Sequence, residues 1–220
     1  MYLCTIIIIV GHLLHGFVLR HAHFPVGFFV ALPEKSIIFA ENNLGMAITS
    51  DRLRQTFSEG GALEIYHEIK SDGDFLGFTK QYAFDSDYRV ARSALWGLTK
   101  ATDKELSQLQ ILLDELINQA MHTEDSSVRR LTLSIIERLE LTEDNLRTDF
   151  LDFCLDHMVA GDELPGIQTL SMKLAYRMCN FYPELKEEYK RIIEAMEISY
   201  YKPAVKGLRT KILSGKYQYK

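Results

Sequence analysis

The chain has 220 residues, of which 47% are hydrophobic and 25% charged, and its formal net charge is −5. This balance is typical of a folded soluble domain and excludes a disordered chain. The negative charge disfavours nucleic-acid binding through the whole surface, although basic groups gathered on one face could still bind it. Cys4, Cys154 and Cys179 are far apart and form no Cys-x-x-Cys pair, so the sequence predicts neither a disulfide framework nor a zinc knuckle.

Residues 1–45 differ from the rest of the chain because they contain two apolar runs without helical amphipathicity. They lack the basic start and the small-residue cleavage site of a signal peptide, and they are marginal in length for a membrane span. We interpret them as an apolar extension outside the folded domain, translated from a mis-chosen start upstream of Met46. The alternative is a membrane tether through residues 1–32.

The same segment carries four histidines at positions 12, 15, 21 and 23. No carboxylate or thiolate accompanies them on a predictable element, so we expect no metal site. We expect no cofactor either. The chain is predicted to be cytoplasmic and to contact no membrane, unless residues 1–45 are a genuine tether.

A repeat of 38 residues is the strongest pattern after this segment. Three sets of four apolar residues follow the same step, and within each repeat their members lie three or four positions apart. This spacing predicts the buried faces of four equivalent helices, within 72–84, 103–121, 143–158 and 184–200. The sets are Phe75, Leu113, Leu151 and Tyr189; Phe78, Leu116, Cys154 and Ile192; and Tyr82, Ala120, Met158 and Met196.

A second helix follows each of these first helices. Each begins near an anchor residue, and the anchors are separated by 38, 39 and 38 positions. From each anchor the apolar residues continue at offsets 3, 4, 7, 8 and 11, which is a helical stripe. The anchors are Val90, Val128, Ile167 and Val205, in predicted helices within 87–101, 125–140, 164–181 and 202–215.

Residues at the predicted helix boundaries agree with the period. Thr102 and Glu105 have the spacing of a capping box. Pro183 stands in the first turn of a first helix, and Pro165 and Pro203 each precede an anchor by two positions. Since a helix pair of this length cannot bury its apolar side alone, the pairs are expected to stack.

The predicted fold class is therefore all-α, an α-solenoid of about four antiparallel helix pairs within a folded domain of residues 46–220. Residues 49–70 are expected to supply one or two N-terminal helices that cap the stack. Gly60 and Gly61 are the predicted break between them.

The second helices resemble the HEAT family of helical repeats. Residues 125–129, Asp-Ser-Ser-Val-Arg, match that family's Asp-x-x-Val-Arg signature, and residues 87–92 match it with the arginine displaced by one. The last two repeats lack the aspartate and carry Gln168 and Lys206 after the anchor. The resemblance implies a right-handed superhelix whose second helices line the concave side, and it implies no chemistry.

Charge separates between the two kinds of helix. The predicted second helices carry a net charge of +8 and the first helices one of −10, which predicts a basic concave face and an acidic convex face. Offsets 2, 6, 9 and 10 from each anchor lie opposite the apolar stripe. The basic and aromatic residues there, the candidate binding residues, are Arg92, Trp96, Lys100, Arg130, Arg138, Lys173, Tyr176, Arg177 and Lys211.

Two interpretations of this face remain open. It is either a clamp for an acidic segment or a phosphate backbone, or a ladder in which the charges pair with acidic residues of adjacent repeats. We expect a non-enzymatic protein-binding scaffold or adaptor, because no Gly-rich phosphate loop, HExxH or GxSxG motif occurs. The alternative is nucleic-acid binding, with or without the base excision of a HEAT-like DNA glycosylase that removes alkylated purines. Trp96 and Glu137 are the nearest counterparts of the catalytic residues of such an enzyme.

Overall fold

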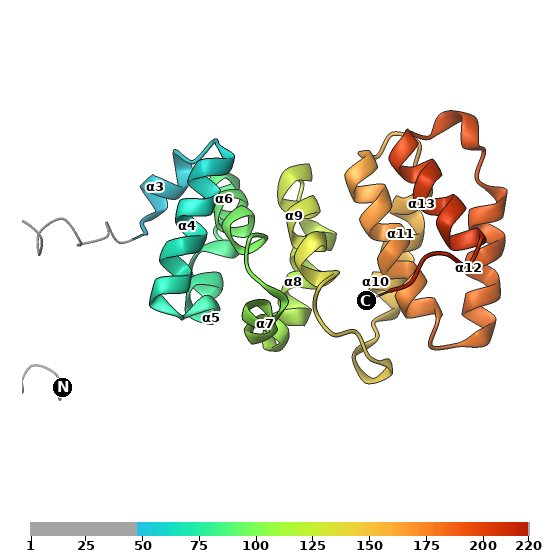
Figure 1. Cartoon of the computed structure of the whole chain (residues 1–220), viewed down its shortest axis with the longest axis horizontal. Coiled ribbons are helices and arrows are strands. Elements are labelled where there is room, and N and C mark those ends of the chain that lie inside the picture. Colours follow the sequence, from blue (N-terminus) through green and yellow to red (C-terminus); the bar gives the residue numbers. More distant parts are fainter. Residues whose placement is uncertain (1–47, 220) are drawn as a thin grey trace, which may run out of the picture. The chain divides into compact units, whose positions relative to one another are not determined.

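The computed structural model describes residues 48–219, and this part of the chain consists of helices and connecting loops without a β-strand (Figure 1). The prediction of an all-α fold is confirmed. The second helices are α6 (Tyr88–Leu98), α9 (Ser126–Ile136), α11 (Pro165–Cys179) and α13 (Pro203–Leu213). The first helices are α5 (Phe75–Phe78) with η1 (Thr79–Ala83), α7 (Asp103–Leu106) with η2 (Ser107–Leu112) and α8 (Leu113–His122), η3 (Glu143–Asn145) with α10 (Thr148–Val159), and α12 (Pro183–Ala195) with η4 (Ile198–Tyr200).

The residues that recur every 38 positions form the inner faces of these helices. Eleven of the twelve members of the three sets are buried, and Ile192 is partly buried against the same core. All four anchors are buried, with no more than 2% of each side chain exposed. The predicted equivalence of the four helix pairs is therefore confirmed by the burial of the matched residues.

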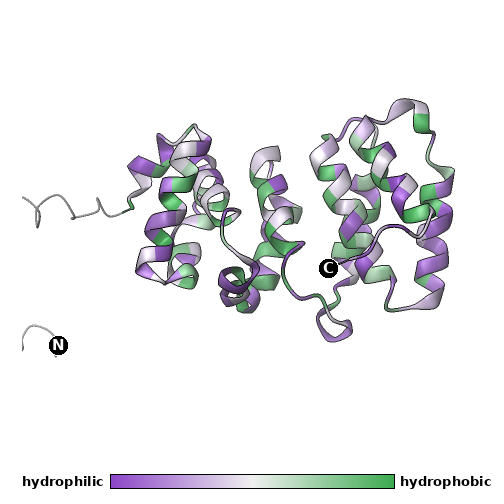
Figure 2. Ribbon diagram, viewed as in Figure 1, coloured by the Kyte–Doolittle hydropathy of each residue, from purple (hydrophilic) through white to green (hydrophobic). Residues whose placement is uncertain are grey.

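The pairs stack through their second helices. In sequence order, α6 contacts α9, α9 contacts α11, and α11 contacts α13. Within the pairs, α8 packs on α9 and α10 on α11. Figure 2 shows that the helices carry hydrophobic and hydrophilic residues on different sides, and the buried hydrophobic residues form one core that runs through all four pairs. Stability in such a stack comes from contacts between neighbouring repeats.

Two further helices, α3 (Ser50–Arg54) and α4 (Glu59–Asp72), precede the first pair and pack on α6. The N-cap of α3 is Thr49, which lies 38 positions before Asp87, the N-cap of α6. The cap therefore begins in register with the second helices. The predicted break at the two glycines is wrong, because Ser58 accepts a hydrogen bond from Gly61 N at 3.1 Å and so starts α4 before them.

An ion pair fixes this cap on the stack. Arg54 Nε donates to Asp87 Oδ2 at 2.7 Å, and this bond, together with the backbone N–H of Arg89, holds the pKa of the Asp87 carboxyl below its ordinary value. Asp87 thus serves both as N-cap of α6 and as an attachment point for α3.

The first helices are less regular than predicted. Gly73, at φ 78°, ends α4, so the first pair begins at Phe75 after the N-cap Asp74. The predicted helix 103–121 contains a 3₁₀ segment, η2, between α7 and α8. The predicted capping box of Thr102 and Glu105 is present at the start of α7, with Thr102 N donating to Glu105 Oε2 at 2.7 Å.

Residues 1–45 lie outside the described residues. The predictions of an apolar extension, of a membrane tether and of histidines without a metal site all fall on this segment. Within residues 48–219, none of the helices has the length and hydrophobicity that a membrane span needs. The same part of the chain contains no cluster of three or more potential metal ligands. Cys154 and Cys179 are buried free thiols, and burial raises the pKa of Cys179 to about 11, so this thiol stays protonated at neutral pH.

Gly97 makes the close approach of α6 to α4 possible. A Cβ atom at this position would lie 2.6 Å from Ile65 Cγ2, which is closer than atoms in a packed core approach. We expect Gly97→Ala to lower the free energy of unfolding by about 1–3 kcal/mol, because the added methyl overpacks the interface. Chemical denaturation of the full chain measures this change.

Gly207 provides the matched control, since it also lies inside a second helix but has nothing within 4 Å of its Cβ position. Gly207→Ala should raise the free energy of unfolding by about 0.5–1 kcal/mol, because alanine loses less backbone entropy than glycine on folding. Two substitutions of the same kind are thus expected to have opposite signs. If both stabilise the chain equally, α4 and α6 do not approach each other as described.

Candidate binding face

The aspartates of the repeat signature begin the second helices. Asp125 accepts hydrogen bonds from the backbone N–H groups of Ser127 at 2.9 Å and Val128 at 2.8 Å. Asp87 caps α6 in the same way, through the N–H of Arg89 at 3.0 Å. The last two repeats replace this cap by proline at the first helical position, where the missing N–H has no intrahelical partner. The signature aspartate is therefore a helix cap in this chain.

The residue after the anchor ties the second helix to its own first helix. Arg129 Nε donates to the carbonyl of Ala120 at 3.1 Å, near the end of α8. Gln168 occupies the matching position in the next repeat and donates through Nε2 to the carbonyl of Ala160, the C-cap of α10, at 2.6 Å. Glutamine thus replaces the arginine of the signature with a similar contact near the end of the first helix, because both side chains supply an N–H donor.

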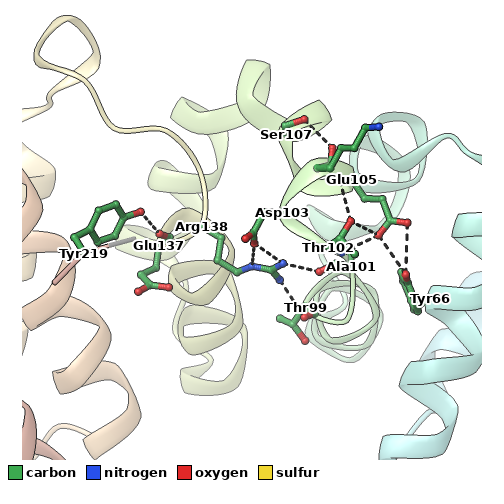
Figure 3. A network of polar contacts seen from close by, with 11 residues as sticks. Tyr66, Thr99, Ala101, Thr102, Asp103, Glu105, Ser107, Glu137, Arg138 and Tyr219 are labelled. Carbon is green, nitrogen blue, oxygen red and sulfur yellow. Dashed lines mark hydrogen bonds and ion pairs between the residues drawn. The ribbon is translucent and has the colours of Figure 1, made fainter. Parts of the chain in front are cut away.

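The two arginines at offset 10, Arg138 and Arg177, connect successive second helices. Arg138 donates to the carbonyls of Thr99 at 3.2 Å and Ala101 at 2.6 Å, and its Nε donates to Asp103 Oδ1 at 2.7 Å (Figure 3). Arg177 repeats the arrangement one repeat later. These carbonyls follow the C-terminal ends of α6 and α9, where the helix dipole favours a positive charge.

Arg177 is the more enclosed of the two. Its guanidinium donates to the carbonyls of Glu137 at 2.8 Å and Leu139 at 2.9 Å, and only 8% of the residue is exposed. Burial lowers the pKa of this group from its ordinary value, and the nearby residues Tyr219, Glu137 and Tyr217 act in the opposite direction. Arg177 therefore lies between repeats, and its guanidinium is buried instead of exposed on the surface of the second helices.

Three other predicted residues also contact the preceding repeat or the cap. Lys173 Nζ lies 3.0 Å from Glu137 Oε1, and Lys100 forms an ion pair with Glu59. Arg92 Nη2 donates to the carbonyl of Thr56 at 3.3 Å. Lys100 and Lys173 therefore pair with carboxylates as the ladder interpretation expects, although both remain partly exposed, whereas Arg92 contacts a backbone carbonyl.

The two predicted aromatic residues are packed. Trp96 is partly buried against the hydrophobic core. Tyr176 packs on Tyr189 with 5.8 Å between the ring centroids. Glu137 is the acidic residue that the DNA glycosylase alternative requires, and its carboxylate forms an ion pair with Lys173.

Arg130 and Lys211 are exposed, and within residues 48–219 neither forms an ion pair. The aliphatic part of Arg130 lies close to Gly166 at the start of α11. Lys211 and Lys173 line one cavity of about 550 Å³ between α11 and α13. Two of the nine predicted residues thus share a cavity.

A third side chain of this cavity, Tyr217, follows the last helix and was not among the predicted residues. Its ring meets that of Tyr176 edge-on, with 5.3 Å between centroids, and burial raises the pKa of its hydroxyl to about 12. Tyr219 lies over the guanidinium of Arg177, 3.7 Å from the ring centroid. In the sequence, only Gly215 just after α13 signals a turn that could bring these tyrosines back.

Comparison with protein families gives a match to the HEAT repeat domain over residues 49–216. Comparison with curated proteins and with solved structures gives no significant match. The matched segment covers the cap and all four helix pairs, and it includes the signature residues described above. The chain therefore belongs to the HEAT-repeat family, whose members generally serve as scaffolds for protein–protein interaction.

Proposed function

We propose that this chain is a non-enzymatic scaffold that holds an acidic segment of a partner protein. The binding site is the basic face formed by Arg130, Lys173 and Lys211 on α9, α11 and α13. The observation that carries the proposal is the cavity between α11 and α13, which brings Lys173 and Lys211 together. Arg130 and Lys211 support it, because they are exposed and no ion pair in residues 48–219 neutralises them.

The residues of the basic face differ in their contacts from the two arginines that bind backbone carbonyls between repeats. Arg138 and Arg177 use their donors on carbonyls of the preceding repeat, so they have few donors left for a partner. Lys173 has a carboxylate partner in Glu137 but still lines the cavity. An acidic segment would place its carboxylates near Lys211 and Arg130 and share Lys173 with Glu137. Ion pairs of this kind contribute more to the association rate and to specificity than to affinity.

Charge reversal tests the proposal. A labelled oligoglutamate peptide should bind the full chain at low salt, and binding should be read by fluorescence anisotropy. Lys211→Glu and Arg130→Glu should each weaken binding by about tenfold, or about 1.4 kcal/mol, because an attractive contact becomes repulsive. Binding should also weaken as salt is raised.

Lys190→Glu is the matched control, because Lys190 is an exposed lysine of the first helix α12 and its reversal changes the net charge equally. This variant should bind the peptide within about twofold of the unmodified chain when the two are compared at an ionic strength of about 0.1 M, where charges more than about 10 Å apart are largely screened. A short DNA duplex serves as the competing probe. The proposal is wrong if the peptide does not bind, if Lys190→Glu weakens binding as much as Lys211→Glu, or if only the duplex binds.

A further inference from the structure

The segment after α13 turns back because of its glycine. Gly215 has φ 68°, and its N–H donates to the carbonyl of Ile212 at 3.0 Å. The N–H of Lys216 donates to the carbonyl of Lys211 at 2.9 Å. These two bonds form a Schellman motif, which ends a helix and reverses the chain. Residues 216–219, which we call the tail, therefore run back toward α11 (Figure 1).

Two tyrosines attach the tail to the second helices. The hydroxyl of Tyr219 donates to the carbonyl of Glu137 at 2.9 Å (Figure 3), and its ring lies 3.7 Å from the Arg177 guanidinium. Tyr217 meets Tyr176 edge-on. Gln218 between them is exposed, which agrees with an extended segment whose alternate side chains point to the same side. We call the receiving surface, Tyr176 with Arg177 and the Glu137 carbonyl, the tyrosine cradle.

The cradle adjoins the basic face. Tyr217 lines the same cavity as Lys173 and Lys211, and Tyr219 binds the backbone of Glu137, the residue whose carboxylate pairs with Lys173. A segment that enters the cavity would therefore meet the tail. The tail is an imperfect occupant, because it brings the exposed, positively charged Lys216 to a face that is already basic.

We infer that the partner segment is acidic and also carries an aromatic side chain, which takes the place of Tyr219 on Arg177, so that the tail and the partner compete for the cradle. This inference rests on the proposed function and adds the aromatic requirement to it. The flat guanidinium of arginine favours an aromatic ring stacked on it. Acidic neighbours of that ring would pair with Lys211 where the tail presents a lysine.

Two labelled peptides of equal length and charge test the inference. One alternates glutamate with tyrosine, and the other alternates glutamate with alanine. The full chain should bind the tyrosine peptide more tightly. Tyr219→Ala should increase affinity for the tyrosine peptide by about fivefold, because a competing intramolecular occupant is lost and the competent fraction rises. It should change affinity for the alanine peptide by less than about twofold.

Tyr200→Ala is the control for tyrosine removal, since Tyr200 is 78% exposed and lies outside the cradle. It should leave both affinities unchanged.

A second pair of variants acts on the turn. Gly215→Val should release the tail and match Tyr219→Ala, because valine resists the left-handed conformation, whereas Gly215→Asn should behave like the unmodified chain.

The outcomes distinguish this inference from the proposed function. If both peptides bind equally and Tyr219→Ala changes neither, the aromatic requirement and the competition are wrong. The proposed function then stands, provided that binding still depends on Arg130 and Lys211. If neither peptide binds any of these chains, both the proposed function and the inference built on it are wrong.

Discussion

Phe75→Ala should lower the free energy of unfolding of the full chain by about 3–5 kcal/mol, because it removes a buried aromatic ring and leaves a cavity. Phe75 is 2% exposed and is the first member of the set that recurs every 38 positions. It lies in α5, which starts the first helix of the first pair and contacts α4 of the cap. Urea denaturation, followed by circular dichroism, measures the loss.

Phe57→Ala is the matched control, because it removes the same side chain at a position that is 72% exposed. Its one described ring contact is with the guanidinium of Arg92, at 5.6 Å. A cation–π contact at an exposed site contributes about 0.5–1 kcal/mol, so this variant should lose no more than that. Comparable losses from the two variants would show that Phe75 is not part of the repeat core.

Arg177→Ala is expected to have the second largest effect, a loss of about 2–4 kcal/mol in the free energy of unfolding. The substitution removes both donors to the carbonyls of Glu137 and Leu139, at 2.8 and 2.9 Å. Leu139 is 3% exposed, so water reaches its carbonyl poorly, and an unsatisfied buried acceptor destabilises the folded state. The desolvation of the guanidinium, which lowers the pKa of Arg177, offsets part of the loss.

Two companion variants separate this contact from the charge. Arg177→Lys keeps the charge but lacks the planar fork that reaches two carbonyls, so we expect a loss between those of the unmodified chain and Arg177→Ala. Arg130→Ala removes an exposed arginine of another second helix, α9, and should change the free energy of unfolding by less than about 0.5 kcal/mol. Equal effects of Arg177→Ala and Arg130→Ala would contradict the capping role.

Four of the predicted basic residues therefore form two contrasting pairs. At offset 10, Arg138 and Arg177 satisfy carbonyls at the C-terminal ends of the preceding second helices. At offsets 2 and 6, Arg130 and Lys211 are exposed. Function and stability can thus be changed separately, and binding experiments on this chain should use substitutions at Arg130 and Lys211.

The sequence by itself determined the helix pairs and their stacking. Apolar residues at a 38-residue step can be buried only if equivalent helices stack, so the positions of Phe75, Leu113, Leu151 and Tyr189 sufficed to predict four buried faces. The capping box at Thr102 was equally readable, because a capping box is a local interaction. The irregular starts of the first helices could not be predicted from the sequence, since they depend on contacts with the cap and with neighbouring pairs.

Only the tertiary structure decided what each basic residue contacts. Helical periodicity places a side chain on one side of its own helix, but it does not show which groups of the next repeat lie opposite. Arg138 and Arg177 were predicted to lie on the basic concave face with Arg130 and Lys211, yet they reach the ends of the preceding helices because stacking brings those carbonyls within 2.6–3.2 Å. The contacts of the tail could not be predicted for the same reason, since Tyr219 and Glu137 are 82 positions apart and meet only in the folded chain.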